Sequence, residues 1–346
     1  MKQFTSLKGL LALMIFVHHL NLYDGGGSLA VCLFFMIGGF LSTIGYHQRI
    51  FETDWNYKNY MLGKCIKFYP LHWILTLATI PFALLPILLH GATNLLASLG
   101  LFALNASLLH SLIPLKEVYF SYNFVSWYLS DTLIFVALFP FILRWLMGAT
   151  KNVKILAGTF ALCLYVLLWI FLPSEYTHAV FYINPFVRLL DYVIGIQCGL
   201  LFLSHKAFLL KHAEQSRIFR FTGIISFALL VCISLVSLEL SFHSVIYILP
   251  AGIFILSVAT NGGGILQTQR LQRFGSICFA FYLSHQVVLR YLHLLLKRVD
   301  CDVLYIYAPV AFVLTTIISY YLTYYFDKKV SSWLKEKINR RSTTAR

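Results

Sequence analysis

Charged residues are scarce in this sequence, making up 12% of its 346 residues, whereas 59% are hydrophobic. A water-soluble globular domain carries about 25% charged residues, so a soluble protein is excluded. A membrane crossing needs roughly 20 consecutive apolar residues, and about ten such stretches can be drawn along the chain. The sequence therefore predicts an all-α, polytopic integral membrane protein, a bundle of about ten transmembrane helices.

The signatures of several other site types are also missing. The seven cysteines are scattered, have no C-x-x-C spacing and fall mostly inside apolar stretches, as small core residues do. There is no H-E-x-x-H, G-x-S-x-G or Walker phosphate loop. The histidines show no recognisable ligand spacing, so no metal site is predicted. A cleaved signal peptide is not expected, because the first apolar stretch contains His18 and His19 and lacks a small-residue cleavage site.

The distribution of positive charge predicts how the chain is oriented. The 27 Lys and Arg residues outnumber the 13 Asp and Glu residues, but they lie between apolar stretches. They do not form the basic stripe of a soluble nucleic-acid-binding surface, so no nucleic-acid partner is expected. With both termini in the cytoplasm, nearly all of them fall on the cytoplasmic side, as the positive-inside rule requires. The exceptions are Lys116, Arg188, Arg290, Lys297 and Arg298.

The apolar stretches define the expected domain organisation. The expected spans are 8–24, 28–46, 66–89, 124–143, 153–173, 183–203, 219–240, 244–260, 275–296 and 303–326. Residues 94–112 are also apolar, but an eleventh crossing there would place the later basic loops outside, so we predict a re-entrant or interfacial segment. Residues 1–326 form the expected membrane-embedded domain. Residues 327–346 form a basic cytoplasmic tail, amphipathic enough to lie on anionic lipid head groups.

Titratable groups inside a membrane span are costly and therefore indicate function. The first span carries Lys8 near its cytoplasmic end and His18 and His19 about 15 Å further along the helix. Because adjacent helical residues point about 100° apart, only one of the two histidines can face a given cavity. A neutral imidazole can take a proton from an attacking hydroxyl or accept an acyl group itself. The structural alternative is a hydrogen bond to a neighbouring helix.

Further polar groups lie at the start of, or inside, other expected spans. Lys64 and Lys67 are three residues apart and so share a helix face, where they could hold the phosphates of a nucleotide-type donor or simply anchor the span. Arg188 and Asp191 have the spacing of an ion pair that neutralises both charges. The remaining candidates, in the fourth and ninth spans, could serve helix packing or chemistry: Trp127, Asp131, Tyr282 and His285.

Several short motifs occur in a fixed order along the chain. Lys8 is followed after ten positions by His19, residues 34–40 read F-F-x-x-G-G-F, and residues 64–70 read K-x-x-K-x-x-P. Residues 127–130 read W-x-L-S, and further signatures occupy 184–195 and 274–285. In this order and with this topology, the motifs resemble those of the acyltransferase 3 family of bacterial membrane acyltransferases. The spacing from Lys8 singles out His19 over His18.

The resemblance implies a function for several of these residues. The family transfers an acyl group, usually acetyl from cytoplasmic acetyl-CoA, to a sugar hydroxyl of a surface or lipid-linked glycan, in the bacterial inner membrane. His19 would be the catalytic base or a transient acyl carrier. The acyl-CoA is a substrate, and no permanently bound cofactor is expected. The phosphates of CoA would lie near Lys8, Lys64 and Lys67, and the acceptor-binding or supporting polar cluster would comprise His18, Trp127, Asp131, Arg188, Asp191, Tyr282 and His285.

The sequence departs from the family pattern at three basic positions. Lys8, Lys64 and Lys67 stand where the family has arginines. Lysine keeps the positive charge but lacks the planar fork that holds phosphate through two parallel hydrogen bonds. The change from arginine to lysine therefore bears on two properties: how tightly the acyl-CoA donor is bound and which acyl-CoA is chosen.

Two other classes of function fit the same polar residues. A transporter or flippase for a lipid-linked glycan or a small polar solute also needs polar groups at mid-membrane depth. Transporters often show paired broken helices in two related halves, and no such symmetry is evident in the sequence. A membrane sensor or assembly partner would use the polar cluster as a ligand or assembly site. Consumption of acyl-CoA distinguishes the enzyme from both.

Overall fold

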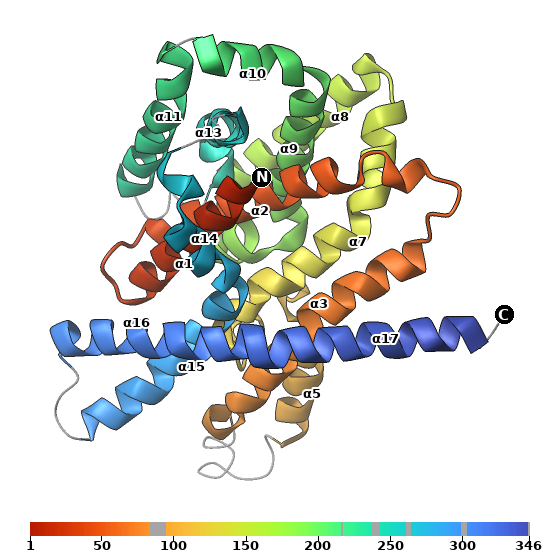
Figure 1. Cartoon of the computed structure of the whole chain (residues 1–346). Helices are drawn as coiled ribbons and strands as arrows, with labels where there is room; N and C mark the ends of the chain where they lie inside the picture. Colours follow the sequence, from red (N-terminus) through yellow and green to blue (C-terminus); the bar gives the residue numbers. More distant parts are fainter. Residues whose placement is uncertain (84–94, 216, 237–242, 261–263, 299–302, 345–346) are drawn as a thin grey trace. The chain divides into compact units, whose positions relative to one another are not determined.

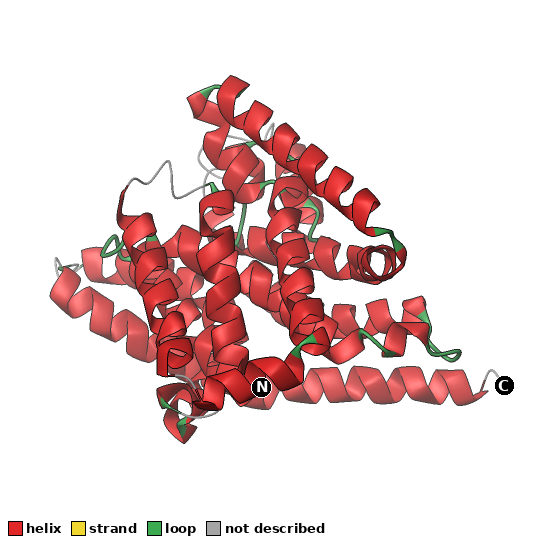
Figure 2. Ribbon diagram, turned by 90° about the horizontal axis from the view of Figure 1, so that it is seen from above, coloured by secondary structure: helices red, strands yellow, loops and turns green. Residues whose placement is uncertain are grey.

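The computed structural model describes residues 1–83, 95–215, 217–236, 243–260, 264–298 and 303–344 (Figure 1). Within these ranges the chain is helical and has no β-strand (Figure 2), so the predicted all-α class is confirmed. The expected spans 66–89 and 219–240, the expected segment 94–112 and the expected tail 327–346 each lie partly outside the described residues. Five of the described helices are long and apolar enough to cross a membrane: Gly26–Tyr46, Phe124–Gly148, Lys151–Phe171, Pro185–Ser204 and Leu304–Ile338.

The α8 helix (Lys151–Phe171) shows why these helices belong in a lipid environment. Thr150 begins it as an N-cap whose side chain accepts a hydrogen bond from the backbone N–H of Val153. The buried residue of this helix is Tyr165, whereas Leu156 and Phe171 are 71% and 77% exposed. Apolar surface in water costs roughly 25 cal/mol per Å² relative to an apolar environment. A helix this apolar and this exposed is stable in contact with lipid chains, as a multi-pass membrane protein requires.

The chain divides into two compact units, each discontinuous in sequence. The first comprises Met1–Phe4, Asn21–Trp55 and Ile134–Thr268, and the second Thr5–Leu20, Asn56–Leu133 and Gln269–Arg346. Two helices contribute residues to both units: α1 (Lys2–His19) and α7 (Trp127–Gly148). Besides α8, the first unit includes α2 (Gly26–Tyr46), α9 (Pro185–Ser204), α10 (Lys206–Gln215), α11 (Arg217–Val236) and α13 (Ile248–Thr260). The second includes α3 (Tyr57–Ala78), α5 (Leu95–Ala106), α6 (Lys116–Tyr119), α14 (Gln269–Ser276), α15 (Cys278–Lys297), α16 (Leu304–Tyr321) and α17 (Lys328–Thr344).

Glycines let α2 and α9 pack backbone against backbone in the first unit. A Cβ atom added at Gly39 would overlap the carbonyl oxygen of Tyr192, and one added at Gly195 would overlap the carbonyl oxygen of Met36. Small residues at such crossings are a common way for membrane helices to approach closely. The second glycine of the F-F-x-x-G-G-F motif therefore has a packing role.

This packing predicts opposite effects for two otherwise identical substitutions. Gly195→Ala should destabilise the protein by about 1–3 kcal/mol, because the added methyl group forces α2 and α9 apart. Gly158→Ala is the matched control on α8, where an added Cβ meets nothing within 4 Å. There the better helix propensity of alanine should stabilise by about 0.5–1 kcal/mol. Thermal unfolding of the detergent-purified variants measures both effects, and shifts of the same sign would contradict the packing argument.

In the second unit, one face of α3 holds the end of α5. The last carbonyls of a helix have no partner within it. Tyr69, His72 and Trp73, which share a helix face, donate hydrogen bonds to the consecutive carbonyls of residues 105–107 at distances of 2.8–2.9 Å. The α5 helix has 12 residues, a length of about 18 Å, which is shorter than the roughly 30 Å hydrocarbon core. This short, capped helix occupies most of the segment for which a re-entrant or interfacial path is predicted.

The end of the second unit is one long helix. A π-helical turn over Leu322–Asp327 joins α16 to α17, so the helix runs unbroken over Leu304–Ile338 (Figure 1). The expected last span, 303–326, thus continues directly into the basic residues of the expected tail. Asp327 lies at this junction, and Ser331 donates a hydrogen bond to its Oδ1 at 3.4 Å.

Candidate active site

The second unit brings His19 and His285 into direct contact. His19 is the last residue of α1, and His285 lies in the second turn of α15. The Nδ1 atom of His19 is 3.2 Å from Nε2 of His285 and 2.9 Å from the carbonyl oxygen of Ile15. The Nδ1 atom of His285 is 2.6 Å from the carbonyl oxygen of Tyr282. Two histidines separated by 266 positions therefore form one hydrogen-bonded pair.

These contacts assign the protons of the pair. A carbonyl oxygen only accepts, so His285 must carry its proton on Nδ1 and donate it to Tyr282. In a neutral imidazole the other nitrogen is then an acceptor, which makes Nε2 of His285 accept from Nδ1 of His19. With its proton on Nδ1, His19 has an unprotonated Nε2. That nitrogen has the lone pair that a general base or nucleophile needs.

Burial distinguishes the two histidines. His285 is completely buried, whereas His19 is half-buried and so accessible from one side. His18 is also half-buried, and its ring lies 5.1 Å from that of His19 in an edge-to-face arrangement. As expected from the angle between adjacent helical residues, it is His19 that faces His285. Of the pair, His19 is therefore the member with both an accessible side and an unprotonated nitrogen, whereas His285 is enclosed and bonds His19 from behind.

The loop before α7 fixes the turn of α15 that bears His285. Asn123 donates from its side-chain amide to the carbonyl oxygen of Leu283 at 2.9 Å. The Tyr282 hydroxyl donates in return to the carbonyl oxygen of Val125, also at 2.9 Å. Each bond pairs a buried polar side chain with a backbone group, the usual requirement for polar groups in an interior. Tyr282 thus supports the site from two sides, through its hydroxyl here and through its carbonyl at His285.

The W-x-L-S motif lies at the start of α7, beside the same turn. Trp127 is 4% exposed and Asp131 is fully buried. The ring of Tyr128, next to Trp127, packs against that of Tyr282 at 5.2 Å. Ser130 donates to the carbonyl oxygen of Leu108 at 2.6 Å, which gives the motif's serine a structural role.

The three lysines expected to bind the donor form one cluster in the second unit. Lys8 lies on α1, and Lys64 and Lys67 lie on α3. The charge of Lys67 lies close enough to interact with the charges of Lys64, Lys8 and Asp327. Three positive groups and one negative group leave the cluster with a net positive charge, which favours an anionic ligand. Lys8 precedes His19 by about 16 Å along α1.

Lys64 lies just before the expected span 66–89, and its pKa is shifted from the usual value for lysine. Burial, together with the positive charge of Lys67, lowers the pKa of Lys64 from 10.5 to about 8. Its Nζ atom lies 4.9 Å from the centre of the Tyr60 ring. A bound phosphate would offset the repulsion between the two lysines and favour the charged form of Lys64.

Arg188 and Asp191 belong to the first unit and form the ion pair expected from their spacing. Their Nη2 and Oδ2 atoms are 3.1 Å apart, and the side chains are 1% and 0% exposed. The guanidinium also lies over the ring of Phe35 on α2, 5.2 Å from its centre, and over the ring of Tyr182 at 5.9 Å. The pair ties α9 to neighbouring elements of its own unit, whereas the histidine pair and the lysine cluster belong to the second unit.

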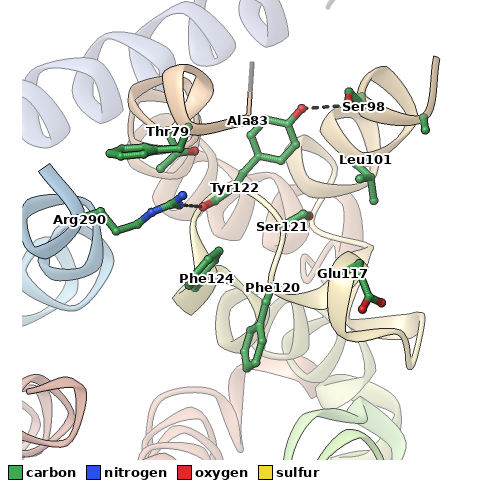
Figure 3. Close-up of a pocket in the computed structure, with 12 residues that line it drawn as sticks. Thr79, Ala83, Ser98, Leu101, Glu117, Phe120, Ser121, Tyr122, Phe124 and Arg290 are labelled. Atoms are coloured by element: carbon green, nitrogen blue, oxygen red, sulfur yellow. Dashed lines mark hydrogen bonds between the residues drawn. The ribbon is translucent and has the colours of Figure 1, made fainter. Parts of the chain in front are cut away.

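The second unit also contains a cavity of about 370 Å³ that sequence reasoning did not single out (Figure 3). Arg290 lies on one side of it, and its Nη1 donates to the carbonyl oxygen of Tyr122 at 3.0 Å. Its guanidinium lies 4.1 Å from the centre of the Phe82 ring and 4.6 Å from that of Phe124. One feature of the sequence pointed to this place: Arg290 is one of the few basic residues expected on the outer side of the membrane.

The described part of the chain is helical, with helices apolar enough to cross a membrane, a hydrogen-bonded histidine pair and a basic cluster, which are the features of a multi-pass membrane protein with polar groups available for chemistry. The family model described as an acyltransferase domain, acyltransferase 3, matches residues 2–324, nearly the whole chain. The protein therefore belongs to the acyltransferase 3 family and is an acyltransferase, as the motifs predict. Comparisons with curated proteins and with solved structures found no match.

Proposed function

We propose that this acyltransferase moves an acyl group, in the first instance acetyl, from cytoplasmic acyl-CoA to a hydroxyl of a cell-surface or lipid-linked sugar. Its location would be the bacterial inner membrane. The observation that supports this most strongly is the histidine pair, because its hydrogen bonds leave Nε2 of His19 ready to take a proton or attack a carbonyl. Proton-coupled transporters and pH sensors also use such a nitrogen, so consumption of acyl-CoA is the observation that separates the enzyme from both.

Two routes use the same nitrogen. In the first, Nε2 takes the proton of the sugar hydroxyl as its oxygen attacks the thioester carbonyl carbon. The C–S bond then breaks, an ester forms, and the proton passes from His19 to the departing sulfur. In the second, Nε2 attacks the thioester carbonyl carbon, the C–S bond breaks and CoA leaves as a thiolate. The oxygen of the sugar hydroxyl then attacks the acyl carbon, the bond to Nε2 breaks, and the hydroxyl proton passes to the thiolate. In both routes His285 holds the His19 ring in its working tautomer.

The lysine cluster supports a donor that carries phosphates. Lys8, Lys64 and Lys67 present net positive charge beside α1, about 16 Å along the helix from His19. A CoA thioester is long enough to have its phosphates at such a cluster while its acyl carbon reaches a distant base. We therefore expect the donor to enter from the cytoplasmic side, between the basic starts of the first and third expected spans.

The test of the proposal is mass spectrometry of surface glycan from cells with and without the gene. Glycan from cells that have the gene should carry the mass increment of an acetyl group, and glycan from the deletion should lack it. Acetyl-CoA consumption by protein reconstituted in lipid vesicles should depend on added glycan. Unchanged acetylation with less glycan at the surface would overturn the proposal in favour of an export function.

The pKa of Lys64 makes donor binding sensitive to pH. Lys64 is charged below about pH 8 and neutral above it, so the KM for acyl-CoA should rise as the pH is raised through about 8. Lys64→Gln should raise KM about tenfold at pH 7, the loss of roughly one charge-assisted hydrogen bond. Lys64→Arg should remove the pH-dependent rise, because an arginine stays protonated throughout this range. The same rise in KM for the wild type and Lys64→Arg would show that another group is responsible.

A further inference from the structure

We propose that the cavity beside Arg290 is the acceptor-binding site and that it takes a sugar bearing an oxyanion, either a carboxylate or a phosphate ester. This inference rests on the proposed function, because it assigns the second substrate of the same reaction. Its volume of about 370 Å³ falls within the roughly 300–1,000 Å³ of small-molecule sites. Three features support this assignment: the lining of the cavity, the contacts of Arg290 and the place of the cavity along α15.

The lining combines aromatic rings with polar groups at opposite sides. In Figure 3, Arg290 and Glu117 lie on opposite sides of the cavity, with Tyr122, Phe120 and Phe124 between them. Aromatic faces pack against the apolar C–H face of a sugar ring, while charged and hydroxyl groups bond its substituents. The exposed Glu117 carboxylate can accept hydrogen bonds from sugar hydroxyls at the open side. Such a lining suits a ring with polar edges better than it suits an acyl chain.

Arg290 is held as a fixed cation. The rings of Phe82 and Phe124 pack against its guanidinium, and the bond to the Tyr122 carbonyl uses one of its five N–H donors. In the part of the chain that the structure describes, the ion pair joins Arg188 to Asp191, and Arg290 takes part in none. A partly buried guanidinium that is paired with no carboxylate among the described residues favours an oxyanion ligand, which its planar fork can hold through two parallel bonds.

The cavity lies further along α15 than the histidine pair. Arg290 follows His285 by five residues on α15, about 8 Å along the helix. Cys278, at the start of α15, is close enough to Lys8 and Lys67 for their charges to act on it. Along this one helix, the donor lysines, the histidine pair and the cavity therefore follow one another in that order. Five helical residues also turn the side-chain direction by about 140°, so Arg290 and His285 point to different faces of α15, and a sugar held at Arg290 has to reach around the helix to present a hydroxyl to His19.

The loop that forms one wall of the cavity also fixes the catalytic turn. Tyr122 accepts the bond from Arg290, and the next residue, Asn123, bonds the carbonyl of Leu283 two residues before His285. The Tyr122 hydroxyl donates to the carbonyl oxygen of Ser98 at 2.9 Å (Figure 3). The cavity and the turn that bears His285 are thus supported by the same loop.

The test measures sugar binding directly, without acyl-CoA. The full chain in lipid nanodiscs is titrated by saturation-transfer NMR with methyl glucuronide, glucose 1-phosphate and methyl glucoside, and inorganic phosphate, which has no C–H protons, is measured as a competitor. At least one charged sugar should bind about tenfold or more tightly than the neutral glucoside, and more tightly than phosphate alone. Whether the carboxylate or the phosphate sugar is preferred identifies the source of the oxyanion. Equal binding of charged and neutral sugars would overturn the inference.

Substitutions test whether Arg290 is the residue that causes the preference for charged sugars. Arg290→Gln should reduce the ratio of charged to neutral binding to near one. Lys297→Gln is the matched control, because it removes the same charge from an exposed position further along α15 that does not line the cavity. A ratio of affinities is insensitive to the fraction of folded protein, so partial misfolding does not confuse the result. An unchanged ratio in Arg290→Gln would also overturn the inference.

The two proposals fail separately. If selective sugar binding is seen but no acyl group is transferred, the proposed function is wrong and the cavity remains a site for oxyanion-bearing sugars. If glycan is acylated but the cavity shows no charge preference, the acceptor site lies elsewhere and the proposed function stands.

Discussion

Replacing His19 by alanine should lower the rate of acyl transfer by at least about a hundredfold, the smaller end of the range for removal of a general base. The reason is that Nε2 of His19 is the acceptor nitrogen that the hydrogen bonds leave available. If His19 carries the acyl group, the loss should be larger, since no other group takes over the covalent step. The rate is measured as acceptor-dependent release of CoA thiol by protein reconstituted in vesicles.

His18→Ala is the matched control for this substitution. It removes the same side chain from the neighbouring position, and the two rings are in edge-to-face contact. We expect the His18 variant to retain most of the activity, because the pair with His285 is made by His19. Equal losses in the two variants would show that the histidines act through the packing of the end of α1 and not through one nitrogen.

A substitution at His285 separates positioning from catalysis. His285→Gln keeps an acceptor that can bond Nδ1 of His19, whereas His285→Ala removes it. We therefore expect His285→Ala to lower the rate by about 10- to 100-fold, as loss of an orienting partner typically does, and His285→Gln to recover part of it. A His285→Gln variant as inactive as His285→Ala would contradict the orienting role.

Local sequence patterns predict the components of the site better than their assembly. The spacing from Lys8 to His19 and the helical spacing of Lys64 and Lys67 are visible in the sequence, and so is the spacing of Arg188 and Asp191. The contact between His19 and His285 joins residues 266 positions apart, and no helical periodicity relates them. The partner of a reactive residue is set by tertiary packing, here by how α15 lies against the end of α1.

Helix ends likewise follow local hydrogen bonding and not hydropathy. The expected span 66–89 begins where the chain turns apolar, but α3 begins at Tyr57. Asn56 sets this start, because its side chain accepts a bond from the Asn59 N–H at 3.0 Å. The expected last span ends where charge begins, yet the helix continues through Asp327 into α17. No proline or glycine stops it there, and charged side chains are good helix formers outside the membrane.

The buried ion pair of the first unit should give the largest change in stability. Arg188→Met leaves the fully buried Asp191 carboxylate without its partner, and Asp191→Leu leaves the guanidinium in the same position. Removing one member of a buried pair typically costs about 3–5 kcal/mol, because the remaining charge is neither hydrated nor neutralised. We expect each single variant to lose stability by about this amount, measured by denaturant unfolding of the purified protein in detergent.

The double variant, Arg188→Met with Asp191→Leu, decides what the pair is for. With both charges gone, apolar side chains of similar size can pack against Phe35 and the rest of α2, and such replacements are often neutral or stabilising. We expect the double variant to recover most of the stability lost in the single variants and to retain acyl transfer. A double variant that is stable but inactive would show that the ion pair takes part in substrate binding or catalysis and not only in the stability of the first unit.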